Sequence, residues 1–225
     1  MPSPSTSRRE SSRSSSGLDV RHLGRVAYAE ALALQEDLRR ARGAGAIPDT
    51  VLLLEHPDVI TFGRSARDGT ALLGDAELRA AGYEVFRVNR GGDVTWHGPG
   101  QLVGYPILDL EARGRDVHRY LRDLEAVLIA ALGDLGIPAL RRDGFAGVWL
   151  DDWRKIASIG VGVRQWLTIH GFALNVCCDL GRFAAIVPCG LPGVQMVSVS
   201  SVLGRTMSLE QAAGKVDARL REVFA

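Results

Sequence analysis

Apolar residues recur at helical spacing near the beginning of the chain, and charged residues lie away from their stripe. The stripe consists of Ala27, Ala31, Leu34, Leu38 and Ala41. This periodicity predicts an amphipathic helix. A short apolar run then covers residues 49–55 and ends at His56-Pro57, which is typical of a buried strand.

Two strand-like segments, residues 83–90 and 101–110, flank the stretch RGGDVTWHGPGQ. Glycine loses much conformational freedom on folding, so its clustering here indicates constrained backbone or a close approach to a ligand. The stretch lacks the Gly-Lys-Ser/Thr ending of a phosphate-binding P-loop and does not open a helix. This argues against a phosphate cradle and leaves a tight turn between two strands, or the wall of another kind of site.

The second half of the chain also alternates between predicted helices and predicted strands. Residues 117–135 carry a second helical stripe, which Gly136 and Pro138 stop. Residues 155–176 have the pattern of two strands joined near Gln165-Trp166. Ser208 and Gln211 form a capping box before a last amphipathic helix. With no internal repeat and no second linker, residues 18–225 are predicted to form a single α/β domain, a mixed β-sheet flanked by helices.

Residues 1–17 are rich in serine and arginine and contain no apolar stretch. Such a segment cannot bury enough surface to fold, so we expect a disordered tail. The missing apolar segment argues against a secretory signal, whereas an organelle transit peptide shares this composition. A bacterial tail, a misassigned start and organelle targeting all stay open.

Net charge and cysteine content bear on the possible partners and on the cellular compartment. The formal net charge of +1 gives no support to nucleic-acid or membrane binding through bulk electrostatics. The three cysteines cannot all pair with one another, so a reducing, cytoplasmic setting fits better than a disulfide scaffold. No interface stripe stands out, and a monomer is the expectation.

Lysine is rare in this chain: only Lys155 and Lys215 occur among 27 basic residues. Arginine cannot give up its proton in a protein, whereas a desolvated lysine can. Strand alternation predicts that Lys155 shares a face with the apolar residues Ala157, Ile159 and Val161, and that Ser158 and Gly160 lie on the other face. The lysine either extends to solvent or is partly desolvated.

Cys189 lies in the segment AIVPCGLPG, between a proline with fixed φ and a glycine. A thiol on such a stiff turn can be presented to a substrate. Cys177 and Cys178 lie at the end of a strand and are interpreted as small packing residues or as bystanders to the chemistry. No metal-ligand spacing and no Gly-x-Ser-x-Gly element occur, so we expect neither a metal site nor a serine hydrolase triad.

Four segments together resemble a known family: RGGDVTWHGPGQLVGYPILDL, KIASIGVGV, HGFALNV and IVPCG. They follow one another as in the octanoyl-(acyl-carrier-protein):protein octanoyltransferases of lipoic acid synthesis. The resemblance runs from about Leu18 to the end of the chain and implies the fold of the biotin and lipoate protein ligases. It also implies that Cys189 takes the acyl group as a thioester and that Lys155 lowers the pKa of that cysteine and shuttles protons.

The same resemblance implies a substrate-binding set and the partners. Substrate contacts are expected at Arg90, Gly91, Gly92, Asp93, Val94, Thr95, Trp96, His97, Ser158, Ile159, Gly160, Gly171, Phe172 and Ala173. Trp96 stands where the family often has tyrosine or phenylalanine, and we expect it to add apolar surface to the acyl pocket. His97 and His170 are placed near the pocket without a defined role. No cofactor is implied.

The implied donor is octanoyl acyl carrier protein. The implied acceptors are lipoyl domains of 2-oxoacid dehydrogenases and the glycine cleavage H protein. Two other classes stay open. An ATP-dependent biotin or lipoate ligase, or a related amidotransferase, would share the fold but need no nucleophilic cysteine, and a carrier-protein binding module would tolerate alkylation of Cys189.

Overall fold

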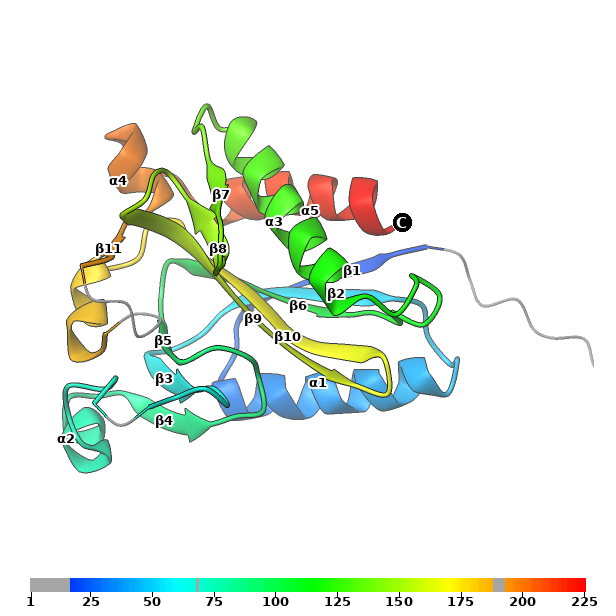
Figure 1. Cartoon of the computed structure of the whole chain (residues 1–225), viewed down its shortest axis with the longest axis horizontal. Helices are drawn as coiled ribbons and strands as arrows, with labels where there is room; N and C mark the ends of the chain where they lie inside the picture. The colour runs from blue at the N-terminus through cyan, green and yellow to red at the C-terminus, as the bar shows by residue number, and fades with distance from the viewer. Residues whose placement is uncertain (1–16, 68, 188–192) are drawn as a thin grey trace, which may run out of the picture.

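The computed structural model describes residues 17–67, 69–187 and 193–225 of the 225-residue chain (Figure 1). Within this part of the chain eight strands form the larger sheet, in the order β1-β2-β6-β10-β9-β8-β7, with β11 paired to β9. Their bounds are β1 (Asp19–Arg25), β2 (Thr50–Glu55), β6 (Gln101–Ile107), β7 (Leu140–Arg142), β8 (Phe145–Trp149), β9 (Arg154–Arg164), β10 (Leu167–Asn175) and β11 (Gln195–Met196). The sheet is mixed, because β1 runs parallel to β2 whereas β6 runs antiparallel to both β2 and β10.

A second, three-stranded sheet has the order β4-β3-β5. It consists of β3 (Val59–Phe62), β4 (Glu84–Arg87) and β5 (Val94–His97). The helices are α1 (Tyr28–Gly43), α2 (Asp75–Ala80), α3 (Val117–Gly133), α4 (Val199–Leu203), α5 (Leu209–Phe224) and the 3₁₀-helix η1 (Leu180–Ala185). The predicted α/β class with a mixed sheet flanked by helices is confirmed, and the small sheet is an addition that the sequence analysis missed.

Helices cover both faces of the larger sheet (Figure 1). The buried strand β2 serves both layers: Val51 and Leu53 belong to the core that includes α3 and α5. Leu52 and Leu54 belong to the core beneath α1. Successive side chains of a strand point to opposite faces, so an unbroken apolar run is what a strand covered on both sides requires.

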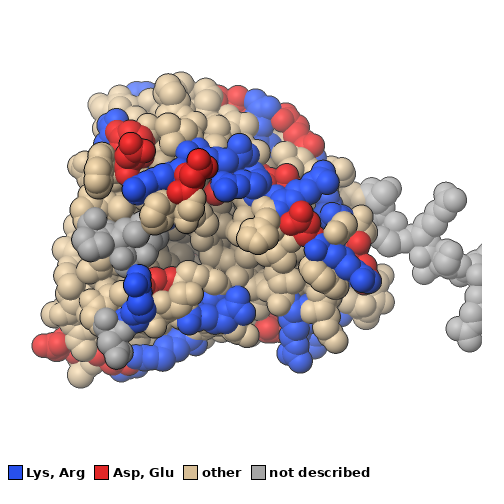
Figure 2. Space-filling view, in the orientation of Figure 1, with Lys and Arg blue, Asp and Glu red and all other residues tan. Residues whose placement is uncertain are grey.

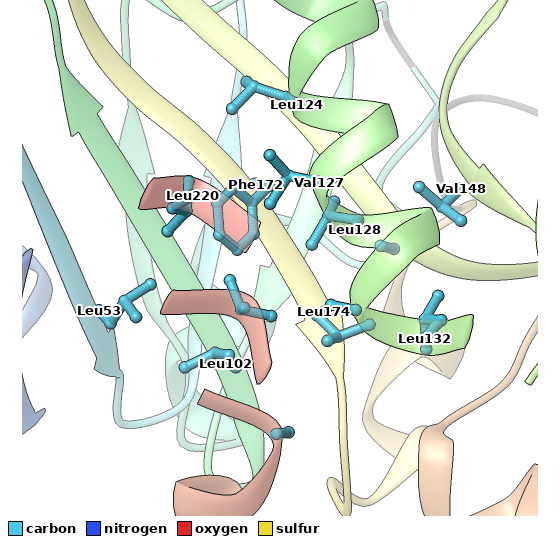
Figure 3. Close-up of a cluster of buried hydrophobic side chains, with 14 of the residues drawn as sticks. Leu53, Leu102, Leu124, Val127, Leu128, Leu132, Val148, Phe172, Leu174 and Leu220 are labelled. Carbon is cyan, nitrogen blue, oxygen red and sulfur yellow. The ribbon is translucent and has the colours of Figure 1, made fainter. Parts of the chain in front are cut away.

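The largest core lies between the sheet and the helices α3 and α5 (Figure 3). Leu124 and Leu128 of α3 are fully buried there, and Phe172 and Leu174 of β10 come from the sheet. Leu124 and Leu128 both belong to the helical stripe that the sequence predicted. Asp116 caps this helix by accepting a hydrogen bond from the amide of Arg119.

The strands β9 and β10 form the predicted hairpin, joined at Gln165 and Trp166. Both turn residues have positive φ, 52° and 62°, which is the backbone of a two-residue type I′ connection. The hairpin occupies the middle of the larger sheet, between β6 and β8. The hairpin therefore carries two of the four sequence segments that resemble the octanoyltransferases, and the neighbouring strand β6 belongs to a third.

One β-bulge changes the direction of Lys155. Along the β8–β9 ladder Val148 pairs with Ala157 and Trp149 with Lys155, which leaves Ile156 as an extra residue on β9. An inserted residue inverts the alternation on one side of the bulge. Ile156 and Ala157 accordingly both enter the large core, whereas Lys155 lines the cavity described below. The prediction that Lys155 shares a face with Ala157 is wrong for this reason.

The three-stranded sheet has a core of its own, and Trp96 belongs to it. The indole is 1% exposed, packs edge-on against Phe183 and donates a hydrogen bond of 2.9 Å to Asp58. Its neighbours Thr95 and His97 on β5 face the other way. The expectation that the Trp96 side chain adds surface to the acyl pocket is therefore corrected: it packs behind the pocket wall.

No helix among the described residues is both long and apolar enough to cross a membrane. The expected disordered tail falls almost wholly on residues 1–16, outside the part of the chain that the structure describes. The division into a tail and a domain beginning at residue 18 stays a prediction.

Close approach of two strands requires glycine at position 104, and this can be tested. A Cβ atom there would lie 2.1 Å from Cζ of the buried Phe172 ring. We expect Gly104→Ala to displace this ring and to lower the free energy of unfolding by about 1–3 kcal/mol, because overpacked cores are strained. Urea denaturation measures the change.

A matched control is Gly214→Ala in the middle of α5, where a Cβ atom meets nothing within 4 Å. This substitution should stabilise the protein by up to about 1 kcal/mol, through helix propensity alone. If both variants shift the urea midpoint in the same direction, the packing argument for Gly104 is wrong.

Candidate active site

A cavity of about 310 Å³ lies between the two sheets. Its walls come from the loop before β5, from β5 itself, from the bulged end and middle of β9, and from β10. Figure 2 shows that this face of the molecule is hollowed near its centre, between bands of Lys and Arg side chains. The volume is at the lower end of the range for small-molecule sites, about 300–1,000 Å³.

Most of the predicted site residues meet at this cavity. The predicted residues among its lining are Lys155, Arg90, Gly92, Asp93, Val94, Thr95, His97, Ser158, Ile159, Gly160, Gly171, Phe172 and Ala173. Gly91 and Trp96 do not line it. Gly91 lies behind the wall and ties the loop to β9, since its amide donates to the carbonyl of Val161 at 2.8 Å. Cys189 lies outside the described residues.

Arg90 shapes the loop that precedes β5. Its guanidinium is buried and donates to the carbonyl of Thr61 at 2.6 Å and to the hydroxyl of Thr61 at 2.9 Å. Asp93 accepts a hydrogen bond from the amide of Val94 at 2.7 Å. Charged side chains thus hold the backbone of this loop against β3, and the glycines leave room for a ligand beside it.

Lys155 is 2% exposed, so it does not extend to solvent. Its Nζ donates to the carbonyl of Ala146 at 3.0 Å and lies 4.9 Å from the ring centroid of Trp149. A backbone carbonyl and an aromatic face are both favourable partners for a buried ammonium group. Of the two possibilities for Lys155, the desolvated one is correct.

A single peptide group connects Lys155 to Glu125 of α3. The carbonyl of this group, from Ala146, accepts from Lys155, and its N–H, from Gly147, donates to Glu125 Oε1 at 3.2 Å. The Glu125 side chain is 1% exposed and also accepts from Arg122 and Arg141. The carboxylate therefore polarises the peptide in the direction that favours a cation at the carbonyl end.

Only glycine fits at position 147. Its φ is 123°, and a Cβ atom would lie 2.6 Å from the carbonyl oxygen of Ala157 and 2.7 Å from Lys155 Cε. The β8 strand thus approaches the lysine stem as closely as backbone allows. This contact fixes where the ammonium group lies in the cavity wall.

Three histidines gather at the cavity: His56, His97 and His170. His97 and His170 line it, and His56 lies behind them with Nε2 2.8 Å from the Tyr105 hydroxyl. Burial lowers the pKa of His97 to about 3 and that of His56 and His170 to about 4. All three rings are therefore neutral at physiological pH.

Cys178 is buried, as expected for a packing residue, whereas Cys177 is exposed. Burial raises the pKa of both thiols, in Cys178 to about 12. Neither side chain lines the cavity. In the part of the chain that the structure describes, no group of three or more His, Cys, Asp or Glu side chains is arranged to hold a metal ion.

Sequence reasoning missed several lining residues. They are Tyr28, Arg67, Tyr105 and the segment Gly144–Ala146. Tyr28 opens α1 and Tyr105 lies in β6, where the alternation of β6 could have placed Tyr105 on the α1 side. Nothing in the periodicity marks Tyr28 or residues 144–146, because they reach the cavity only through contacts between distant segments.

Acid should destabilise the fold through the three buried histidines. Their folded-state pKa values, about 3 to 4, lie below the ordinary value of about 6.5 in an unfolded chain. The unfolded state therefore binds more protons below pH 6.5, and stability present above that pH is lost as the pH falls toward about 4. Each histidine costs up to about 1.4 kcal/mol per pH unit in this window.

Urea denaturation at about pH 7 and about pH 5 measures this loss. The control is His118→Asn, which replaces an exposed histidine that has no ion pair among the described residues and should leave the difference between the two midpoints unchanged. Equal midpoints at the two pH values in the unsubstituted protein would contradict the assignment of three neutral buried rings.

Solved structures share this fold at low sequence identity. The bipartite lipoate protein ligase of Thermoplasma acidophilum superimposes with a TM-score of 0.71 at 15% identity, over 92% of this chain and 83% of that one. The biotin protein ligase of Aquifex aeolicus, in complex with biotin and ATP, gives a TM-score of 0.56 at 14% identity, over 92% and 70% of the two chains. These likenesses establish the fold that the sequence resemblance implied.

Sequence relatives are much closer. The octanoyltransferase of Syntrophotalea carbinolica is 51% identical over 88% of this chain and 90% of its own length. That of Rubrobacter xylanophilus is 50% identical over 92% and 94% of the two chains. The family model for the lipoyl protein ligase A/B catalytic domain matches residues 27–221. The chain therefore belongs to the lipoyl protein ligase A/B catalytic domain family.

Proposed function

We propose that this protein is an octanoyltransferase, which moves an octanoyl group from acyl carrier protein to a lysine of lipoyl domains. The observation that carries the proposal is the buried Lys155 in the wall of one cavity, together with the glycine-rich loop and the β9 and β10 segments. Relatives about 50% identical bear the name octanoyltransferase and support the same reaction.

Cys189 is the proposed nucleophile. The described residues on both sides of its segment are anchored: Val187 donates to the carbonyl of Thr70 at 2.8 Å, and Met196 pairs with Lys155 between β11 and β9. The chain thus returns to the lysine seven residues after Cys189. The other two cysteines have raised thiol pKa values, which disfavour the nucleophilic thiolate.

The proposed reaction has two halves. Cys189 attacks the acyl carbon of the donor thioester as a thiolate that the positive charge of Lys155 stabilises, the carrier carbon–sulfur bond breaks, and the departing carrier sulfur takes a proton from water. A neutral lysine amine of the acceptor then attacks, a carbon–nitrogen bond forms, and the Cys189 carbon–sulfur bond breaks. The amine proton passes by way of Lys155 to Cys189. Thioester to amide runs downhill, so ATP is not needed.

The expected acceptors are the lipoyl domains of 2-oxoacid dehydrogenases and the glycine cleavage H protein, and the expected location is the cytoplasm. We expect a monomer that uses no cofactor and no metal. The competing function is an ATP-dependent ligase, because the fold is common to both classes. Turnover of free octanoate with ATP would favour the ligase, whereas a requirement for an acyl thioester favours the transferase.

The acyl-enzyme is the first test. Octanoyl carrier protein, mixed with the protein in the absence of lipoyl domain, should add one octanoyl group as a hydroxylamine-labile adduct. Intact mass detects the adduct, and peptide mapping should locate it at Cys189. Adding lipoyl domain without ATP should discharge it as a hydroxylamine-stable amide.

Cys177→Ser and Cys178→Ser are the matched controls and should acylate normally. Cys189→Ser should lose nearly all transfer, since a serine hydroxyl is far from ionised near neutral pH. An adduct on Cys177 or Cys178, or full activity in Cys189→Ser, would disprove the mechanism. Carrier-protein binding that survives alkylation of Cys189, together with no transfer by the untreated protein, would favour a binding module.

Lys155→Arg separates charge from proton relay. Arginine keeps the positive charge but does not give up its proton, so acyl-enzyme should still form while transfer to the lipoyl domain fails. Lys155→Met removes both properties and should depress both half-reactions. Single-turnover rates of the two halves measure the split. Wild-type transfer by Lys155→Arg would show that the lysine relays no proton.

A further inference from the structure

A chain of buried hydrogen bonds runs from a backbone carbonyl to His97. The carbonyl of Val197 accepts from Asn175 Nδ2 at 3.0 Å. Asn175 Oδ1 accepts from Gln101 Nε2 at 3.0 Å, and Gln101 Oε1 lies 2.7 Å from His97 Nδ1. Gln101 and Asn175 are each 1% exposed, so water does not compete for these bonds.

The carbonyl of Val197 determines which group donates and which accepts in each of these hydrogen bonds. A carbonyl can only accept, so Asn175 must present its NH₂ group to Val197 and its oxygen to Gln101. Gln101 must then donate to Asn175, and its NH₂ group also lies 3.3 Å from the carbonyl of Trp96. Its oxygen is left for His97, and the proton between them must belong to His97 Nδ1.

The other ring nitrogen of His97 is left without a proton. Burial and the nearby His56, Arg90 and His170 hold the pKa of His97 at about 3, so a second proton does not bind near neutral pH. Among the described residues no group donates to Nε2. The ring lines the cavity and stacks on Tyr28 with centroids 6.3 Å apart.

We propose that Gln101 and Asn175 are positioning residues that hold His97 as the Nδ1–H tautomer, and that Nε2 accepts a hydrogen bond from an N–H group of the substrate in the cavity. This rests on the proposed octanoyl transfer, in which the attacking amine of the acceptor lysine is the N–H donor that the reaction requires. An acceptor at Nε2 orients that amine. The same tautomer cannot donate to the carbonyl oxygen of a thioester.

The tautomer is measurable in the ligand-free protein. Two-bond ¹H–¹⁵N correlation spectra of protein labelled with [¹⁵N]histidine distinguish a protonated from an unprotonated ring nitrogen. The His97 signals are identified by their loss in His97→Asn, and His22→Asn should leave them unchanged. We expect a protonated Nδ1 and an unprotonated Nε2; a protonated Nε2 in the unsubstituted protein overturns the proposal, whatever the variants do.

Two substitutions of Gln101 test its role. Gln101→Met has a similar shape but cannot accept from Nδ1, so His97 should shift toward the Nε2–H tautomer that free imidazole of histidine favours. Gln101→Glu keeps an oxygen acceptor and should keep the Nδ1–H tautomer. If His97 keeps a protonated Nδ1 in Gln101→Met, the hydrogen bonds of Gln101 and Asn175 do not set the tautomer.

The half-reactions supply a second readout. In Gln101→Met the acyl-enzyme should form at close to the wild-type rate. Its discharge to lipoyl domain should slow about tenfold, because one hydrogen bond is lost in the second half-reaction only. Gln101→Glu should discharge faster than Gln101→Met. Equal slowing of both halves would indicate general damage and contradict a role toward the amine. Absence of any transfer by the unsubstituted protein would disprove the proposed function and leave the tautomer measurement standing.

Discussion

The site depends on keeping one ammonium group out of water. Lys155 is 2% exposed, and a buried cation is stable only where partners replace its hydration. Among the described residues, its partners include the Ala146 carbonyl and the Trp149 ring, and Glu125 acts on it through the peptide group of Ala146 and Gly147. Strand β8 and helix α3 are therefore arranged around this group. The bulge at Ile156 turns the lysine toward the cavity instead of the core.

The histidines at the same cavity differ from Lys155, because they carry no charge near neutral pH. His97 and His170 are neutral because burial holds their pKa values at about 3 and about 4. The ring of His97 is held by a hydrogen bond to Gln101 Oε1 at 2.7 Å, and the backbone of His170 is held by its amide, which donates to Gln35 Oε1 at 2.8 Å. A lysine and neutral imidazole rings in one cavity suit a reaction that moves a proton while an acyl group is transferred.

Periodicity predicted the framework well, and it predicted the hairpin of β9 and β10 with its turn at Gln165 and Trp166. It failed at Lys155, because alternation counts residues and one extra residue inverts every position beyond it. It misplaced the side chain of Trp96 because the small sheet, with its own core around Phe183, left no signal in the pattern. The pair Gln101 and Asn175, 74 residues apart, shares a hydrogen bond that only the folded chain brings together.

The most direct test of the central claim is a crystal structure of the protein with octanoate held as a thioester on Cys189. Our account predicts that the acyl chain lies in the cavity between the loop before β5 and the strands β9 and β10, with Lys155 Nζ within hydrogen-bonding distance of the thioester sulfur. An acyl chain bound elsewhere on the protein, or a Lys155 side chain directed away from the sulfur, would contradict it.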